Sequence, residues 1–176
     1  MNLFFIPLAF AVPESGTMEL DRTQEIYLES RVLRVNIHHQ KGANLEHFDS
    51  SILLDKFVEY SLLYKDVYGI KPKVCTAPEI NIYYVVSSYL NSPAYLYSWL
   101  GDSADFGDGV KYVGLYHYAV FHHDIFISDS HYDIMSLEKR FVHEMSHYWD
   151  KESCIYRDLS GEEKEARAEK MEGLVK

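Results

Sequence analysis

The spacing of hydrophobic and polar residues divides the first part of the chain into two helical stretches and a connecting segment. Between positions 18 and 35, apolar residues stand among charged ones at helical spacing, which predicts a first helix. Between positions 50 and 68, apolar residues recur in steps of three and four, which predicts a second helix that Gly69 and Pro72 end. The connecting segment at 38–47, HHQKGANLEH, is polar and contains a glycine, so we expect a loop there.

An extended pattern follows in the middle of the chain. The segment INIYYVVSSYL (80–90) is rich in β-branched and aromatic residues, as strands are. Two further strand-like runs are KYVGLYHYAVF (111–121) and DIFIS (124–128). Because they are separated by only a few polar residues, we expect them to form a hairpin that joins them near His122, His123 and Asp124.

Helical spacing returns in the last part of the chain. It begins near Asp133, and a further helix is predicted to begin at Ser160, because Ser160 and Glu163 match the S-x-x-E capping box. The predicted order is N-terminal helices, a small mixed or antiparallel sheet and two helices, which is typical of an α+β fold. A chain of 176 residues suits one domain, so we expect residues 1–176 to form a single α+β domain.

The charge balance and hydropathy restrict the partners of the protein. The chain has 17 basic and 27 acidic residues, which gives a net charge of −10. Nucleic-acid binding requires basic surfaces that neutralise phosphates, so we expect no nucleic-acid partner. The sequence contains no apolar stretch of the roughly 18–20 residues that a membrane-spanning helix needs, so we expect no membrane span.

The N-terminal segment and the cysteines bear on the compartment. The segment MNLFFIPLAFAVPES (1–15) has a short apolar run that Pro7 interrupts, with no basic residue before it. This pattern favours a buried first strand or an entry segment over a signal peptide, and therefore a cytoplasmic over a secreted protein. Cys75 and Cys154 are far apart and in no CxxC arrangement, which excludes a Cys-type zinc finger and leaves their pairing undecided.

The most specific chemical signal is the segment HEMSHYWD at 143–150. In a helix, residues four apart lie on one face, so His143 and His147 can offer imidazole nitrogens to a single metal ion. Glu144 lies beside them, where a carboxylate can hold and deprotonate a water molecule. The sequence therefore predicts an H-E-x-x-H zinc site with Glu144 as its general base.

The alternative is that the two histidines stand at helical spacing by coincidence. The apolar stripe of this helix argues against core histidines, because His143 and His147 each lie two positions, a rotation of about 200°, past a stripe residue. The stripe consists of Ile134, Leu137, Phe141, Met145 and Tyr148. The histidines are therefore expected on a face that borders solvent or a cleft.

Two histidines leave zinc short of a ligand, and the predicted C-terminal helix offers several carboxylates. The positions expected for a metzincin hold Asp150 and Ser153 instead of glycine and histidine, which excludes that pattern. Four glutamates fall on one side of the C-terminal helix by steps of three, four and three: Glu162, Glu165, Glu169 and Glu172. Most of them are expected on a solvated acidic face, and one of them is a candidate third ligand.

The combination of H-E-x-x-H with a helical E-x-x-A resembles the gluzincin-type zinc metallopeptidases. Asp150, three residues after His147, is similar to the H-E-x-x-H-x-x-D form of the lethal-factor-like peptidases, with the ImmA-type metallopeptidases as a second choice. The resemblance implies that Glu165 of E-A-R-A is the third zinc ligand. A second, overlapping match begins at Glu163, so the assignment is not unique. Glu169 and Glu162, on the same side of the predicted helix, are the alternatives.

The resemblance also implies a minimal zincin-like domain that acts as a zinc-dependent endopeptidase on a peptide or protein substrate. The strand run before the active-site helix resembles the edge strand with which an extended substrate pairs. Tyr156 is the nearest candidate for a residue that assists the oxyanion. Asp150 is expected to hydrogen-bond a ligand histidine or to cap the helix end.

Three further interpretations are open. The first is a zincin-fold binding or regulatory protein with weak catalysis, and the second is a metal-free acidic interaction protein. The third concerns a second histidine-rich zone, which could hold another metal or consist of polar hairpin residues. Its members are His117, His122, His123 and His131.

Overall fold

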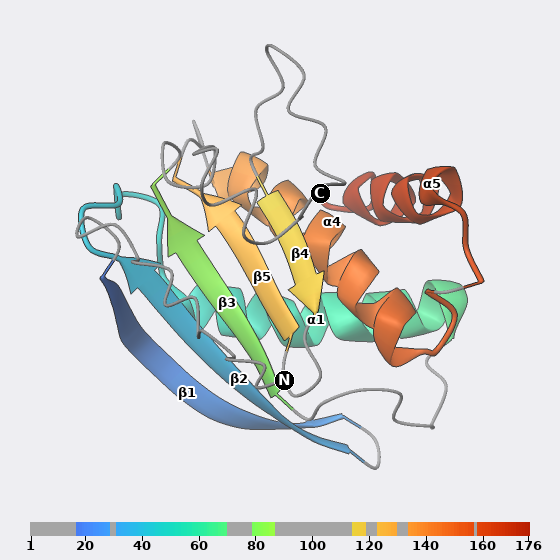
Figure 1. Ribbon diagram of the computed structural model, residues 1–176, viewed down its shortest axis with the longest axis horizontal. Coiled ribbons are helices and arrows are strands. Elements are labelled where there is room, and N and C mark those ends of the chain that lie inside the picture. The colour runs from blue at the N-terminus through green and yellow to red at the C-terminus, as the bar shows by residue number, and fades with distance from the viewer. Residues whose placement is uncertain are drawn as a thin grey trace, which may run out of the picture.

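The computed structural model describes residues 17–28, 31–69, 79–86, 114–118, 123–129, 134–156 and 158–176. Its centre is a five-stranded mixed sheet in the order β1-β2-β3-β5-β4 (Figure 1). The three inner strands are parallel, and both edge strands run antiparallel to their neighbours. The strands are β1 (Met18–Leu28), β2 (Arg31–Gln40), β3 (Glu79–Val85), β4 (Gly114–Tyr118) and β5 (His123–Ser128).

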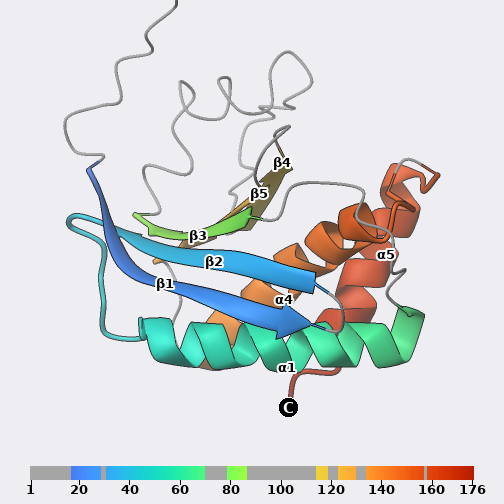
Figure 2. The same ribbon diagram turned by 90° about the horizontal axis from the view of Figure 1, so that it is seen from below.

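The described helices lie together on one face of this sheet (Figure 2). They are α1 (Ser50–Tyr68), α4 (Ile134–Glu152) and α5 (Gly161–Glu172). Helix α4 packs against β4, β5 and both other helices, and α5 packs on α4. This arrangement confirms the predicted α+β class.

The core between sheet and helices is built from alternating strand residues and from the inner stripes of α1 and α4. On β2, Leu33, Val35 and Ile37 are buried and point to the helices, as expected for one face of a strand. Phe57 of α1 and Trp149 of α4 are almost fully buried in the same cluster. The Trp149 indole donates a hydrogen bond to Ser61 Oγ at 3.0 Å and so joins the two helices.

Phe57→Ala is expected to lower the free energy of unfolding by about 3–5 kcal/mol, because it leaves a cavity where the ring had packed. Phe57 is 0% exposed. Leu62→Ala on the same helix is the control, since Leu62 is 49% exposed and its loss should change stability by less than about 0.5 kcal/mol. Denaturant unfolding of both variants measures this difference, and equal effects would contradict the placement of α1.

The predicted first helix, at 18–35, is wrong. This segment forms most of the antiparallel hairpin of β1 and β2, in which Ile26 pairs with Leu33. Nearly all side chains of β1 are exposed, and several of them are charged. Charged side chains are common on edge strands because they discourage pairing with the edge strand of another molecule. Because both faces of β1 are largely exposed, its sequence lacks the alternation that marks a strand with one buried face.

The predicted loop at 38–47 is also partly wrong, because β2 continues to Gln40. The hairpin of the later strands is confirmed, with Tyr118 of β4 opposite His123 of β5. His123 therefore belongs to a strand and not to the turn. The predicted N-terminal strand and residues 119–122 lie outside the described residues.

Both predicted boundaries that depended on capping are confirmed. Helix α1 ends at Gly69, whose positive φ of 74° suits glycine and whose N–H donates to the Lys65 carbonyl at 2.8 Å. Helix α5 begins with the reciprocal capping box of Ser160 and Glu163. The start of α5 is thus determined by hydrogen bonds within its own first turn.

Candidate metal centre

Helix α4 presents the two histidines beside its buried stripe. Leu137, Phe141 and Met145 are each 1% exposed or less, which confirms the predicted stripe. The side chain of His143 is 13% exposed and that of His147 is 10% exposed. Both imidazoles therefore lie at the border of the core, where they are shielded from most of the solvent.

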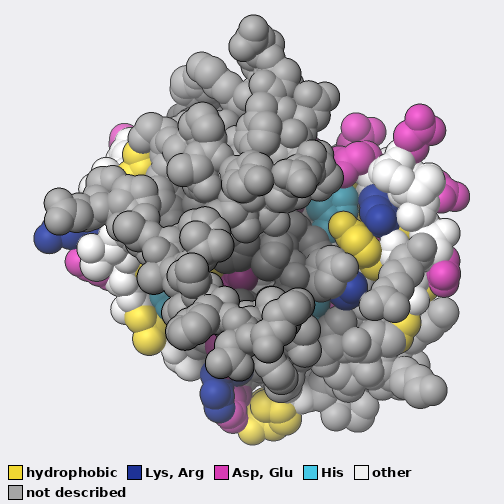
Figure 3. All heavy atoms as spheres, viewed as in Figure 1, with side chains coloured by type: hydrophobic (Ala, Val, Ile, Leu, Met, Phe, Trp, Pro, Cys, Tyr) yellow, Lys and Arg dark blue, Asp and Glu magenta, His cyan; other side chains and the backbone are white. Residues whose placement is uncertain are grey.

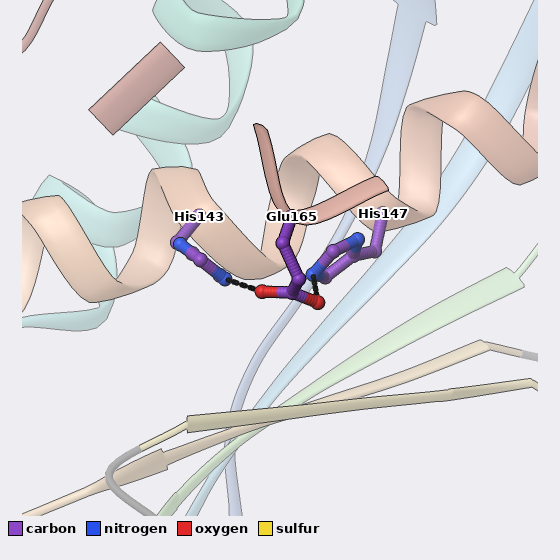
Figure 4. A group of neighbouring side chains, drawn as sticks. All are labelled: His143, His147 and Glu165. Carbon is purple, nitrogen blue, oxygen red and sulfur yellow. Dashed lines mark ion pairs between the residues drawn. The ribbon is translucent and has the colours of Figure 1, made fainter. Parts of the chain in front are cut away.

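The carboxylate of Glu165 lies between the two imidazoles (Figure 4). Its Oε2 is 3.3 Å from His143 Nε2, and its Oε1 is 3.5 Å from His147 Nε2. One ligand atom from each of the three residues lies within 4.8 Å of the others. Two ligands of a tetrahedral zinc ion, each about 2.0–2.1 Å from it, are roughly 3.3 Å apart. Both measured distances are close to this value, although each ends on a different oxygen of Glu165, so the three side chains could hold a zinc ion.

The electrostatics of His147 also suit a metal ligand. Burial lowers the pKa of His147 to about 4, with the nearby Glu165 opposing the shift and His143 adding to it. The imidazole is therefore neutral at pH 7, which is the form that binds a metal. The Glu165 side chain is 58% exposed, so the third candidate ligand faces solvent on one side.

Glu144, the predicted general base, is 7% exposed and follows His143 directly on α4. The structure therefore shows that Glu144 is buried beside the first candidate ligand in the sequence, and its role as the general base stays a prediction.

Asp150 does not have the predicted partner. Its fully buried carboxylate accepts hydrogen bonds from the Tyr64 hydroxyl of α1 and from Arg167 Nε of α5, the latter at 2.9 Å. Within the described residues, no hydrogen bond joins it to His143 or His147. The predicted hydrogen bond to a histidine is wrong because Arg167, 17 residues further along the chain, provides a stronger charged partner. The alternative role at the helix end is carried by the Asp150 backbone, whose carbonyl accepts hydrogen bonds from the N–H groups of Ile155 and Tyr156 at 3.2 Å.

The other predicted site residues do not join the cluster. Of the acidic residues on α5, only Glu165 is part of the three-residue group in the described part of the chain, and Glu162 and Glu169 are exposed. The Tyr156 ring lies beneath Lys164, with Nζ 4.0 Å from the ring centre. This cation–π contact gives Tyr156 a structural partner, and its catalytic role stays a prediction.

Glu172, which the sequence placed among four possible third ligands, has a different position at the site. Its Oε2 lies 3.2 Å from His143 Nδ1, on the side of the ring opposite the Nε2 that faces Glu165. Carboxylates in such positions fix the tautomer and orientation of a ligand histidine. The available signal was the spacing, because Glu172 lies seven residues, about two turns, after Glu165.

Glu172→Gln is expected to weaken zinc binding by roughly 10- to 100-fold, because an amide orients the His143 ring less strongly than a carboxylate. Glu169→Gln is the matched control, since Glu169 is exposed on the same helix and carries the same charge. Competition with a chromophoric chelator measures both affinities. Equal zinc affinities of the two variants would rule out an orienting role for Glu172.

The second histidine-rich zone does not form a metal cluster among the described residues. His123 Nε2 lies 3.2 Å from Glu152 Oε1, and both side chains are 0% exposed. The pair connects the start of β5 to the end of α4. His122 and His131 lie outside the described residues, as does the side chain of His117.

Acidic side chains gather on the surface beside the candidate site. Figure 3 shows them along the side of the molecule on which α5 lies, next to exposed histidine atoms. The residues exposed on α5 include Glu162, Glu163, Glu165 and Glu169. Cys154, just after α4, is disulfide-bonded, whereas Cys75 lies outside the described residues.

Comparisons with known proteins returned no match among family models, curated proteins or solved structures. None of the helices in the described ranges combines the length and the apolar character needed to cross a bilayer. The functional interpretation therefore depends on the geometry and chemistry of the residues themselves.

Proposed function

We propose that this chain is a zinc-dependent endopeptidase of zincin type. The observation that supports it best is the convergence of His143, His147 and Glu165, because two separate helices bring together the donor set that catalytic zinc sites use. Three protein ligands leave a fourth position for water or substrate, unlike a closed structural site.

The proposed chemistry divides the work between the metal and the chain. A zinc ion held by His143, His147 and Glu165 would polarise the substrate carbonyl and increase the acidity of water. Glu144 would take the proton of the attacking water and deliver it to the leaving nitrogen. Glu172 would hold the His143 ring through Nδ1, so that Nε2 stays directed toward the metal.

The position of β4 supports a peptide as the substrate. It is an edge strand of the described sheet, and α4, which carries both histidines, packs against it. An edge strand offers unpaired backbone groups to an extended peptide, which would add to the sheet by backbone hydrogen bonding. The acidic surface of α5 would attract basic peptides and increase their rate of association.

Metal analysis combined with a peptide-library assay tests this proposal. Purified protein is expected to contain stoichiometric zinc and to cleave members of the library, with cleavage lost on chelation and restored by added zinc. Protein that binds no zinc would support the metal-free interaction protein instead. Protein that binds zinc but cleaves nothing in the library would support the binding or regulatory alternative.

The compartment stays a prediction, and one observation now weighs against the cytoplasm. The disulfide bond at Cys154 is typical of proteins in oxidising environments, because cytosolic thiols are kept reduced. The cytoplasmic location that the N-terminal segment favours therefore stays a prediction.

A further inference from the structure

Helix α5, which carries the candidate third ligand, has few apolar contacts to hold it in place. Of its twelve residues only Ala168 and Met171 are buried. Helices of globular proteins depend mainly on the packing of an apolar face for their position. The rotation of α5 about its own axis must therefore be set by further contacts.

Arg167 provides these contacts. Its guanidinium donates to Asp150 Oδ1 through Nε at 2.9 Å, and its Nη2 lies 2.7 Å from the same oxygen. The same Nη2 donates to the Tyr64 hydroxyl at 2.9 Å, and the guanidinium lies 3.7 Å from the centre of the Tyr68 ring. Tyr68 also donates to the Arg167 carbonyl at 3.3 Å. One arginine thus connects α5 to both α4 and α1.

Arg167 and Glu165 lie on opposite flanks of the packed face of α5. At about 100° per residue, Ala168, Met171 and Arg167 lie roughly 60°, 120° and 160° from Glu165 in the same direction. The two buried residues therefore lie between the arginine and the candidate ligand. The contacts of Arg167 on one flank therefore fix the rotation of α5 about its axis. This rotation sets the direction in which Glu165, on the other flank, faces α4.

We propose that Arg167, together with Asp150 and Tyr64, is a positioning residue that sets the rotation of α5 so that Glu165 faces His143 and His147. This inference rests on the proposed metal site and assigns the arginine no contact with metal or substrate.

A double-mutant cycle on zinc affinity tests the inference. Arg167→Met is expected to weaken zinc binding by roughly 10- to 100-fold in the wild-type background. In the Glu165→Gln background the same change should have little effect, because the carboxylate that Arg167 positions is already absent. Equal weakening in both backgrounds, or no weakening in either, would overturn the inference. Arg34→Met, at a largely exposed arginine of β2, is the matched control.

Arg167→Lys covers the case in which Arg167→Met does not fold. Lysine keeps a positive charge for the buried Asp150, but its single ammonium cannot reproduce the two-sided contact with Asp150 and Tyr64. Its circular dichroism spectrum should show a folded protein. Its zinc affinity should be lower than that of wild type, and this difference should disappear in the Glu165→Gln background. Wild-type zinc affinity in a folded Arg167→Lys protein would overturn the inference.

Metal-free protein separates failure of this inference from failure of the proposed function. In NMR spectra of the zinc-free chain, we expect nuclear Overhauser cross-peaks between the Glu165 side chain and the His147 ring in wild type and Arg34→Met. These cross-peaks should be lost in Arg167→Met or Arg167→Lys. If they persist in both, the positioning role is wrong, whereas a wild type that binds no zinc removes only the proposed function.

Discussion

Glu144→Gln is expected to bind zinc like wild type and to cleave peptides roughly 10²- to 10⁴-fold more slowly, as for the loss of a general base. The amide has nearly the same shape as the carboxylate but cannot accept the proton of the attacking water. The residue is 7% exposed on α4, so bulk solvent is poorly placed to replace it. The rate of cleavage of a library-selected peptide, together with the zinc content, measures this effect.

The control for Glu144→Gln is Glu138→Gln on the same helix. Glu138 lies away from the histidines, where it accepts a hydrogen bond from the Tyr60 hydroxyl at 3.0 Å and pairs with Lys56. Its substitution should leave cleavage close to wild type. If Glu144→Gln cleaves the peptide at the wild-type rate, the proposed mechanism is wrong even if zinc is bound.

His147→Ala is expected to weaken zinc binding by more than the roughly 10- to 100-fold typical of a residue that only orients a ligand. It removes one of the three donor side chains, and the remaining imidazole and carboxylate cannot complete the protein part of the site. Cleavage should be lost with the metal. Chelator competition measures the affinity, and the activity assay is repeated with added zinc.

His39→Ala is the matched control for His147→Ala. His39 is also a partly buried histidine with an acidic neighbour, since its Nε2 lies 3.3 Å from Glu19 Oε2 on the β1–β2 hairpin. Its loss should leave zinc affinity unchanged. Similar zinc affinities of the two variants would show that the metal, if bound, is not held by the H-E-x-x-H histidines.

The sequence was most informative where local interactions determine structure. The stripe on α4 depends only on helical periodicity, and the capping box at Ser160 and Glu163 satisfies backbone groups within one turn. Both were predictable because they require no distant partner. The pairing of His143 with His147 on one face follows from the same periodicity.

The misassigned segment at 18–35 shows where local patterns fail. Strand β1 is exposed along nearly all its length, so burial does not impose the alternation of a strand on its sequence, and the helical spacing of its apolar residues was misleading. Its conformation is determined by the backbone of β2, with which it pairs over most of its length. A strand that is held mainly by backbone hydrogen bonds to its neighbour cannot be recognised from its own side chains.

The sequence alone thus determined the α+β class, the histidine pair, the glutamate beside it and a capped helix rich in glutamates. Only the tertiary structure decided which glutamate approaches the histidines and that Glu172 contacts His143. It also showed that Asp150 binds Arg167 and not a histidine. The physical reason is that periodicity defines the faces of each helix, whereas the angle between two helices depends on contacts between residues far apart in the chain.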